Sequence, residues 1–328
     1  MRPLAGQLCS ISVDLDPLAC YCRIHGLGDP EPAMADCVLE RSVPRLLRIL
    51  AERRIRATFF VVAADLAGTS GTSGTSGTSG TRATRALIRE IAGAGHELGN
   101  HTLGHPYDLA RLPRARIVEE VGRAHELIAA TAGVAPIGFR APGYGLSSSV
   151  LEELVRRGYC YDSSVLPSPP YYLAKAAVMA SLRLFGKHSR AVMTDPRLLF
   201  APLEPYRPDL RAPFRRGAAA IVELPIAVTP FARIPAIGTS LLTAPPALRK
   251  CLLAALRRRS FFNLELHGID FVDAASDGIP AELATKEPGL RVGLDRKQQS
   301  FGEVLDVVGR DFRFATLGEV AQEYLARH

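Results

Sequence analysis

The sequence predicts a parallel α/β fold, and more narrowly a (β/α) barrel that spans residues 1–328 as one domain. The first observation is that short apolar segments alternate with amphipathic helical segments along the chain. The second is that polar side chains gather directly after several of the apolar segments. Because the carboxyl ends of parallel barrel strands share one face, these side chains are expected to meet there.

Hydrophobic periodicity places the elements in order. Strand candidates are short apolar runs, whereas helix candidates repeat apolar residues three or four positions apart. The helix over 146–158 has Ser147 to Ser149 before its apolar positions, which is typical of an N-cap. The expected strands cover 8–14, 57–63, 159–164, 218–226 and 261–268; a strand and then a polar loop cover 96–106 and 135–145; helices cover 43–54, 84–95, 115–133, 146–158 and 247–259; a strand–helix pair covers 312–327.

Two segments break the alternation. A perfect Gly-Thr-Ser repeat covers 68–81, and such a composition buries no apolar surface. We expect it to be a flexible loop and a tolerated surface insertion. Residues 166–218 are rich in Pro, Tyr and Arg. They are expected to form an insertion after the fifth strand, where they could act as a substrate lid.

The composition excludes several classes of protein. Apolar residues make up 47% of the chain and charged residues 22%, so a disordered, collagen-like or disulfide-scaffold protein is excluded. No apolar stretch reaches the ~18 residues of a transmembrane helix, and the opening segment leaves no room for a signal peptide. We therefore expect a cytoplasmic protein with its six cysteines reduced. The net charge of +7 weakly favours anionic partners, and no nucleic-acid motif accompanies it.

Two aspartates and two histidines form the most informative set of polar residues. Asp14 and Asp16 lie at i and i+2, so on a continuing strand both carboxylates would point to one face. His101 and His105 lie four residues apart, and on a helical turn their rings would face the same way. One aspartate with two histidines suits a divalent metal, and an open position would admit a water whose pKa the metal lowers.

Further residues could supply the other roles that hydrolysis at such a site requires. The second aspartate could be the general base, and Arg140 could orient it. His267, after the strand LEL, could be the general acid for the leaving group. Glu223 ends another predicted barrel strand and could touch substrate.

Five ordered segments carry a resemblance to a known family: SVDLDP (12–17), NHTLGHP (100–106), FRAPGYG (139–145), YDSS (161–164) and LELHG (264–268). They resemble the motifs of the polysaccharide deacetylases, also called NodB-homology enzymes or family-four carbohydrate esterases. The resemblance runs from about residue 8 to residue 267. It implies a distorted (β/α) barrel and a metal-dependent hydrolase that removes N-acyl groups, usually from amino sugars.

Carried over residue by residue, the resemblance makes Asp14 the catalytic base and Asp16, His101 and His105 the metal ligands. The implied metal is one divalent ion, with Zn²⁺ the first choice and Co²⁺, Ni²⁺ or Fe²⁺ the alternatives. The commonest family form has adjacent aspartates, whereas here Leu15 intervenes. This spacing resembles a divergent subgroup that includes enzymes acting on lipid-linked sugars and small amides. The roles of Asp14 and Asp16 could therefore be exchanged.

The same resemblance assigns the remaining roles. Arg140 corresponds to the arginine that holds the base, and His267 to the general acid. The backbone N–H groups of Gly143 or Tyr144 correspond to the oxyanion donors, and the extra Gly143 leaves that choice open. Asp162 could stand for the aspartate that tunes the acid. The chain has no tryptophan, so the tryptophan usual in the fourth motif is missing.

The sequence thus predicts an enzyme that removes an N-acyl group, above all N-acetyl, from an amino-sugar-containing glycan or glycolipid precursor. The amino sugar could be linked to a nucleotide or a lipid. A deformylase or cyclic-amide hydrolase on the same metal site is one alternative, and an inactive glycan-binding relative is another. The insertion carries Lys175, Arg183, Lys187 and Arg190 among apolar positions, so it could contact an anionic membrane at the inner face. A helix packed on the barrel with a solvated basic edge is the other interpretation.

Overall fold

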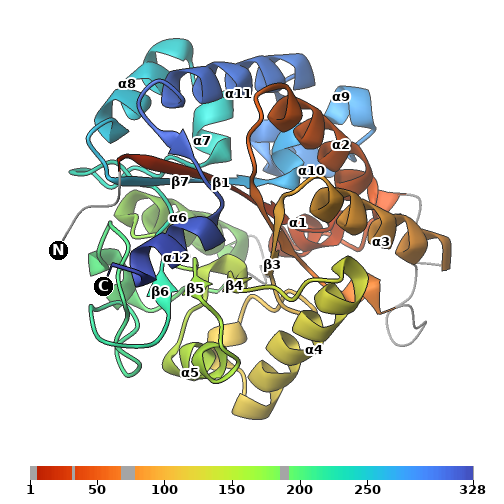
Figure 1. The fold of residues 1–328 in the computed structure, drawn as a ribbon. Helices are drawn as coiled ribbons and strands as arrows, with labels where there is room; N and C mark the ends of the chain where they lie inside the picture. The colour runs from red at the N-terminus through yellow and green to blue at the C-terminus, as the bar shows by residue number, and fades with distance from the viewer. Residues whose placement is uncertain (1–5, 32–33, 68–77, 185–191, 328) are drawn as a thin grey trace.

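The computed structural model describes residues 6–31, 34–67, 78–184 and 192–327. In these ranges eight strands form one curled parallel sheet in the order β6-β5-β4-β3-β2-β1-β7, and β8 pairs with β1 (Figure 1). This is the predicted distorted (β/α) barrel. The strands are β1 (Leu8–Leu15), β2 (Thr58–Val61), β3 (Glu97–Asn100), β4 (Gly138–Phe139), β5 (Tyr161–Asp162), β6 (Val222–Glu223), β7 (Phe261–His267) and β8 (Arg313–Phe314).

Strand β1 pairs with three other strands, and all of its residues are buried. One edge pairs with β7 over nearly its whole length, in a register that sets Asp14 opposite His267. The other edge pairs with β2 near the end of β1 and with β8 near its start. The parallel register explains why side chains from distant parts of the sequence meet at one end of the barrel.

Helices surround the sheet on the outside, as the alternating pattern predicts (Figure 1). Helix α12 differs, because its apolar side chains pack with those of β5 and β6 in one buried cluster. It therefore closes part of the barrel. The helices are α1 (Leu18–Ile24), α2 (Cys37–Glu52), α3 (Thr78–Gly93), α4 (Arg114–Ala132), α5 (Ser148–Arg156), α6 (Pro169–Leu184), α7 (Gly238–Thr243), α8 (Pro246–Leu256), α9 (Ala274–Asp277), α10 (Ala281–Lys286), α11 (Leu294–Val308) and α12 (Leu317–Leu325).

The helix boundaries follow local capping chemistry. The hydroxyl of Ser147 accepts a hydrogen bond from the Val150 N–H at the start of α5, as predicted. Helix α2 begins at Cys37, ahead of the predicted start at 43. Helix α3 begins at Thr78, so the last residues of the Gly-Thr-Ser repeat belong to a helix, while the predicted loop over 68–77 lies outside the described residues.

The insertion after β5 packs on the barrel. Helix α6 buries Tyr172 and Leu182, and the apolar side chains of Tyr172 and Leu198 join a buried cluster that includes residues of α4 and α5. A short bridge between Tyr206 and Glu223 ties the end of the insertion to β6. Lys187 and Arg190, two of its four predicted basic residues, lie outside the described residues. Among the helices described, none combines the length and apolar character that a membrane span requires.

Candidate metal and catalytic site

The polar residues predicted from the strand ends do meet, in a cavity of about 290 Å³ at the carboxyl end of the barrel. Strand β1, the loops after β3 and β4, and the end of β7 each contribute side chains, and α6 covers one side. The lining includes Asp14, Asp16, His101, His105, Gly143, Tyr144 and His267. Seven of the ten predicted site residues therefore line one cavity.

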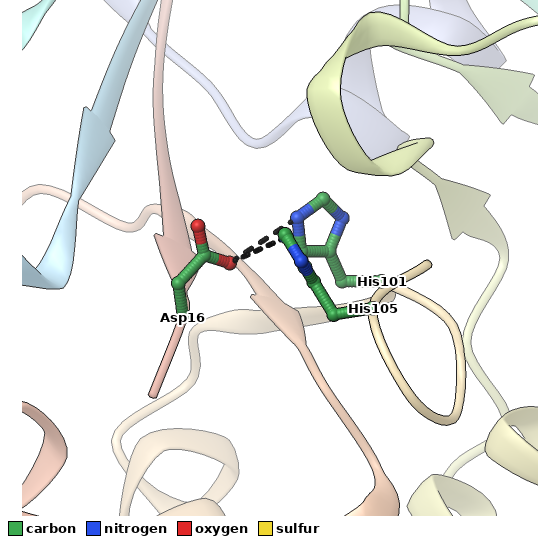
Figure 2. Close-up of side chains that lie close together, drawn as sticks. All are labelled: Asp16, His101 and His105. Atoms are coloured by element: carbon green, nitrogen blue, oxygen red, sulfur yellow. Dashed lines mark ion pairs between the residues drawn. The ribbon is translucent and has the colours of Figure 1, made fainter. Parts of the chain in front are cut away.

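Asp16, His101 and His105 form the first cluster (Figure 2). The Oδ1 atom of Asp16 lies 3.3 Å from Nε2 of His101 and 3.2 Å from Nε2 of His105. All three side chains are buried, and one ligand atom from each lies within 4.8 Å of the others. These residues can therefore hold a metal ion, as predicted.

The donor chemistry of this cluster fits a cation. Nδ1 of His101 lies 2.7 Å from the carbonyl oxygen of Arg140. Since a carbonyl can only accept, Nδ1 carries a proton, and Nε2, which faces Asp16, is the nitrogen that could bind a metal ion. The Oδ1 atom of Asp16 is buried and accepts no hydrogen bond from the described residues. Two lone-pair atoms this close require a proton or a metal ion between them.

The charge on Asp16 is favoured by its neighbours. Burial raises the pKa of the carboxyl, but the rings of His105 and His101 lower it more, so that the pKa lies well below its usual value. Asp16 is therefore a carboxylate at neutral pH. An ionised, buried carboxylate is the form that binds a divalent ion.

The two histidines do not converge by the route predicted. Residues 101–105 are not helical, and Thr102 and His105 have φ angles of 69° and 54°. Asn100 shapes this turn, because its Oδ1 accepts the Thr102 N–H at 2.8 Å, and the Thr102 hydroxyl accepts the His105 N–H at 3.0 Å. Left-handed backbone at residues other than glycine is costly and concentrates at functional sites. The helical-turn argument was thus wrong in mechanism, although the two rings do face one point.

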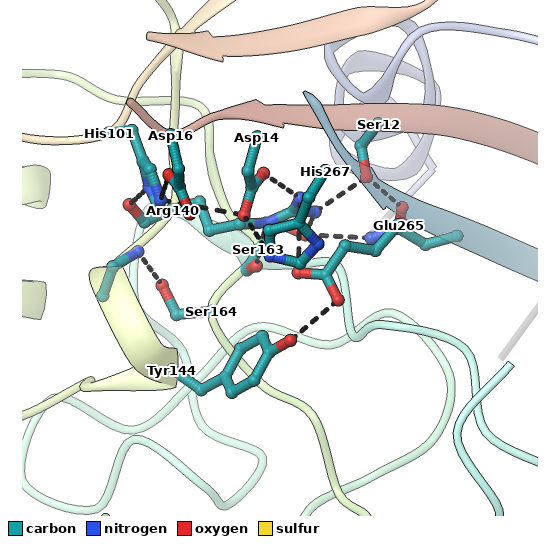
Figure 3. A network of polar contacts seen from close by, with 12 residues as sticks. Ser12, Asp14, Asp16, His101, Arg140, Tyr144, Ser163, Ser164, Glu265 and His267 are labelled. Atoms are coloured by element: carbon teal, nitrogen blue, oxygen red, sulfur yellow. Dashed lines mark hydrogen bonds and ion pairs between the residues drawn. The ribbon is translucent and has the colours of Figure 1, made fainter. Parts of the chain in front are cut away.

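Asp14, Arg140, Glu265 and His267 form the second cluster (Figure 3). Nη1 of Arg140 donates to Oδ1 of Asp14 at 2.6 Å and lies 3.7 Å from Oε1 of Glu265. Nε2 of His267 lies 3.9 Å from Oδ2 of Asp14. Arg140 therefore does contact Asp14, whose other oxygen, Oδ2, also lies 3.7 Å from Nε2 of His101 in the first cluster.

Arg140 is completely buried and held on several sides. Its guanidinium donates to the Ser12 hydroxyl at 2.9 Å and to the Ser163 carbonyl at 2.9 Å. The group also stacks on the ring of Phe60, 4.3 Å from the ring centre. A planar cation with this many partners holds a fixed orientation, so it can fix the position of Asp14.

Opposite charges around His267 favour its protonated form. Burial lowers the pKa of the ring, whereas the carboxylates of Glu265, Asp14 and Asp16 raise it, and the resulting pKa is about 9. Asp270 also faces His267 and accepts its backbone N–H at 2.9 Å. A protonated histidine in the cavity has the form that a general acid requires.

Gly143 and Tyr144 form a tight turn after β4, and both have positive φ angles of 58° and 64°. The Tyr144 N–H donates to the Ala141 carbonyl at 3.2 Å. For the Gly143 N–H, no acceptor lies within hydrogen-bonding distance among the described residues. Of the two oxyanion donors left open by the sequence, Gly143 is therefore the available one.

Asp162 and Glu223 do not reach the cavity. They sit opposite each other on β5 and β6, and both are completely buried. The Ser164 hydroxyl donates to Asp162 at 2.6 Å, and the Val165 N–H donates to Glu223 at 3.0 Å. The carboxylates near His267 are those of Glu265, Asp14, Asp16 and Asp270, and neither Asp162 nor Glu223 lines the cavity. The expectations that Asp162 tunes the acid and that Glu223 touches substrate are corrected accordingly.

Sequence reasoning missed Glu265, whose signal was its position two residues before His267 on the same strand. Side chains at i and i+2 share a face, so Glu265 points into the barrel with His267. Its carboxylate also accepts a hydrogen bond from the Tyr144 hydroxyl at 2.9 Å. Tyr107 was missed as well. Its ring packs edge-on against His105, with 4.7 Å between ring centres.

The fold and these two clusters define a (β/α) barrel with a candidate metal site at its strand ends. Comparison with known families agrees: residues 33–161 match the family model described as polysaccharide deacetylase. The match includes His101, His105 and Arg140, whereas Asp14 and His267 lie outside it. The chain is thus similar to the polysaccharide deacetylases over this region, in agreement with the resemblance drawn from the motifs.

Individual relatives extend this finding. A peptidoglycan deacetylase from Helicobacter pylori is 28% identical over 51% of this chain and 53% of that protein. A chitooligosaccharide deacetylase from Sinorhizobium fredii is 37% identical over 43% of this chain and 60% of that protein. The chain spans between 36% and 60% of the length of such curated relatives. A crystal structure of a Mycobacterium smegmatis protein assigned to the polysaccharide deacetylases matches with a TM-score of 0.58, at 20% identity, over all of this chain and 94% of that one.

Proposed function

We propose that this chain is a metal-dependent hydrolase that removes an N-acetyl group from an amino sugar. The observation that carries the proposal is the placement of Asp16, His101 and His105 beside Asp14 and His267 in one cavity. The similarity to peptidoglycan and chitooligosaccharide deacetylases supports the substrate class.

Asp16, His101 and His105 would hold the metal. Zn²⁺ is our first choice, with Co²⁺, Ni²⁺ and Fe²⁺ as alternatives, because imidazole and carboxylate ligands suit all of these ions. Three protein ligands leave coordination positions for water and substrate. When bound, the ion would lower the pKa of water and polarise the amide carbonyl. Asp16 is our choice of ligand over Asp14, because Asp14 is already paired with Arg140.

The other residues of the site would handle the protons and the developing charge. Arg140 occupies Oδ1 of Asp14, so Oδ2 is the atom that would take a proton from the attacking water. Protonated His267 would give its proton to the departing amine. The Gly143 N–H would donate to the oxygen that becomes negative as the carbonyl is attacked.

The substrate we propose is an acetamido sugar carried on a nucleotide or on a polyprenyl phosphate. The insertion over 166–218 would contact the part of the substrate beyond the acetyl group, since α6 lines the cavity. Leu173 and Leu184 of α6 are 72% and 86% exposed, which supports peripheral contact with a membrane surface. The cytoplasmic location predicted from the sequence stays a prediction.

Product analysis tests the proposal. The purified chain is incubated with N-acetylated chitooligosaccharide and with nucleotide-linked and polyprenyl-phosphate-linked acetamido or formamido sugars. Released acetate and formate are then quantified. We expect acetate, loss of activity after chelation, and recovery with Zn²⁺ or Co²⁺. Formate alone would favour the deformylase. No product from any substrate, together with no stoichiometric metal, would favour an inactive glycan-binding relative.

A further inference from the structure

Helix α6 presents one continuous face to the cavity. Tyr171, Ala174, Lys175, Val178 and Met179 all line it, and their spacing is that of one side of an α-helix. Apart from Lys175, this wall is apolar or aromatic. The wall is far more apolar than the floor of the cavity, where the carboxylates and histidines lie.

Lys175 is the one lysine or arginine that lines the cavity within the described ranges. Its ammonium lies 5.9 Å from the centre of the Tyr172 ring, and no described carboxylate lies within ion-pair distance. Burial lowers the pKa of this lysine to about 8. The sequence explains the missing counter-charge, because residues 163–194 contain no Asp or Glu.

A half-buried cation without a counter-charge costs free energy. The carboxylates of the cavity do not offset this cost, because Asp14 pairs with Arg140 and Asp16 faces the two histidines. A cation that faces a cavity and has no acidic partner among the described residues is therefore suited to an anion supplied by a ligand.

We propose that Lys175 and the apolar side chains beside it on α6 form a subsite for an anionic amphiphile. The molecule that enters the cavity would carry a phosphate or carboxylate at Lys175 and an apolar group against Val178 and Met179. The inference rests on the proposed function only in taking this cavity as the substrate site. It narrows the substrate to an acylated amino sugar joined through an anionic group to an apolar group.

Binding without turnover tests this subsite separately from the proposed function. Hexyl phosphate, hexyl glucoside, inorganic phosphate and uridine monophosphate are titrated into the full-length chain by isothermal titration calorimetry. The variants are Lys175→Gln, Lys175→Arg and Arg183→Gln. Arg183 is the matched control, because it is an exposed cation on the same helix but does not line the cavity.

We expect wild type to bind hexyl phosphate more tightly than inorganic phosphate or hexyl glucoside. Lys175→Gln should weaken binding of hexyl phosphate by about tenfold, because a charge-assisted contact is lost. Lys175→Arg and Arg183→Gln should bind as wild type, and hexyl glucoside should bind all four proteins equally. Unchanged thermal unfolding of Lys175→Gln would show that its fold is intact.

Three results would overturn the inference: no binding of hexyl phosphate to wild type, equal weakening in Lys175→Gln and Arg183→Gln, or tighter binding of uridine monophosphate than of hexyl phosphate. The last would assign the subsite to a nucleotide. Loss of the proposed function would look different, since hexyl phosphate would still bind through Lys175 while no acetate is released from any acetamido sugar.

Discussion

Each of the two clusters contains an aspartate and at least one histidine, but they differ in what balances their charge. Asp16 faces two histidine rings at 3.2 and 3.3 Å, and within the described ranges no arginine pairs with it. Asp14 and Glu265 instead share the buried guanidinium of Arg140 (Figure 3). The chain therefore supplies a permanent cation to the second cluster and only titratable partners to the first.

This difference supports the proposal that the first cluster, and not the second, would bind the metal. A site whose charge is balanced by a fixed arginine gains little from a further cation, because the repulsion opposes the attraction. A carboxylate that faces two imidazole nitrogens is strongly stabilised by a bound cation, since each of the three atoms can donate a lone pair to it. The comparison thus favours Asp16 as the ligand and Asp14 as the base, roles that the sequence alone left exchangeable and that stay a proposal.

Replacing each aspartate with asparagine tests most directly whether the two clusters have different roles. Asp16→Asn should lose both bound metal and activity, because a neutral amide is a weak ligand. Asp14→Asn should keep the metal and lose turnover by about 10²–10⁴-fold, the usual contribution of a general base. Metal content by mass spectrometry and kcat for acetate release provide the two readouts. Metal loss confined to Asp14→Asn would exchange the two assignments.

Removing the permanent cation should have the largest effect on stability. Arg140→Met leaves Asp14 and Glu265 buried together without a counter-charge, and breaking a buried pair in this way costs about 3–5 kcal/mol. Urea denaturation would measure the loss. Arg114→Gln is the control, because Arg114 is an exposed arginine whose ion-pair partner Glu152 is also exposed, and no measurable change is expected. Equal stability of Arg140→Met and wild type would show that Arg140 does not balance the cluster.

The barrel and most of the site could be predicted because their signals are local. The functional side chains lie at or just after the ends of the apolar strands, as with Asp14 near the end of β1 and His267 at the end of β7. Parallel topology then brings the strand ends together whatever the details of packing. His101 and His105 were predicted to converge for the wrong reason, since the turn depends on left-handed backbone at Thr102 that no periodicity reveals.

Glu265, Asp162 and Glu223 show where sequence reasoning fails. All three end or nearly end a strand, and all three are completely buried. Glu265 lies 3.7 Å from Arg140, whereas Asp162 and Glu223 lie opposite each other on β5 and β6. The strand pattern tells which face a side chain takes but not how far the cavity extends over that face. That extent is set by packing between neighbouring strands and by the insertion.

Removing the hydroxyl of Tyr144 should have a smaller effect on activity. It tests whether this hydroxyl positions Glu265 in the second cluster. Tyr144→Phe removes the hydrogen bond to Glu265 without removing a charge. We expect kcat to fall by about tenfold, with bound metal and KM near wild type, because the bond to a charged group positions Glu265 beside His267. A rise in KM at unchanged kcat would instead mean that Tyr144 contacts the substrate.

The smallest effect is expected in the pH dependence of stability. It concerns Asp162 and Glu223, which lie opposite each other on β5 and β6. Burial and the adjacent Asp162 carboxylate raise the pKa of Glu223 well above its usual value of 4.5, so the folded chain keeps a proton that the unfolded chain releases. As the pH rises above 4.5, the unfolded state binds fewer protons than the folded state, and the free energy of unfolding falls. The slope is at most about 1.4 kcal/mol per pH unit for one group.

Glu223→Gln cannot titrate, yet its amide can still donate to Asp162 as the protonated carboxyl does. The variant should therefore match wild type near pH 5 and lose less stability than wild type toward pH 8, at the same metal loading. Urea denaturation across this range measures the two curves, with Glu126→Gln, an exposed glutamate on α4, as the control. Parallel curves for Glu223→Gln and wild type would mean that no proton is held there. Charge balance in the barrel would then depend on Arg140 alone, and the pair on β5 and β6 would be ionised throughout.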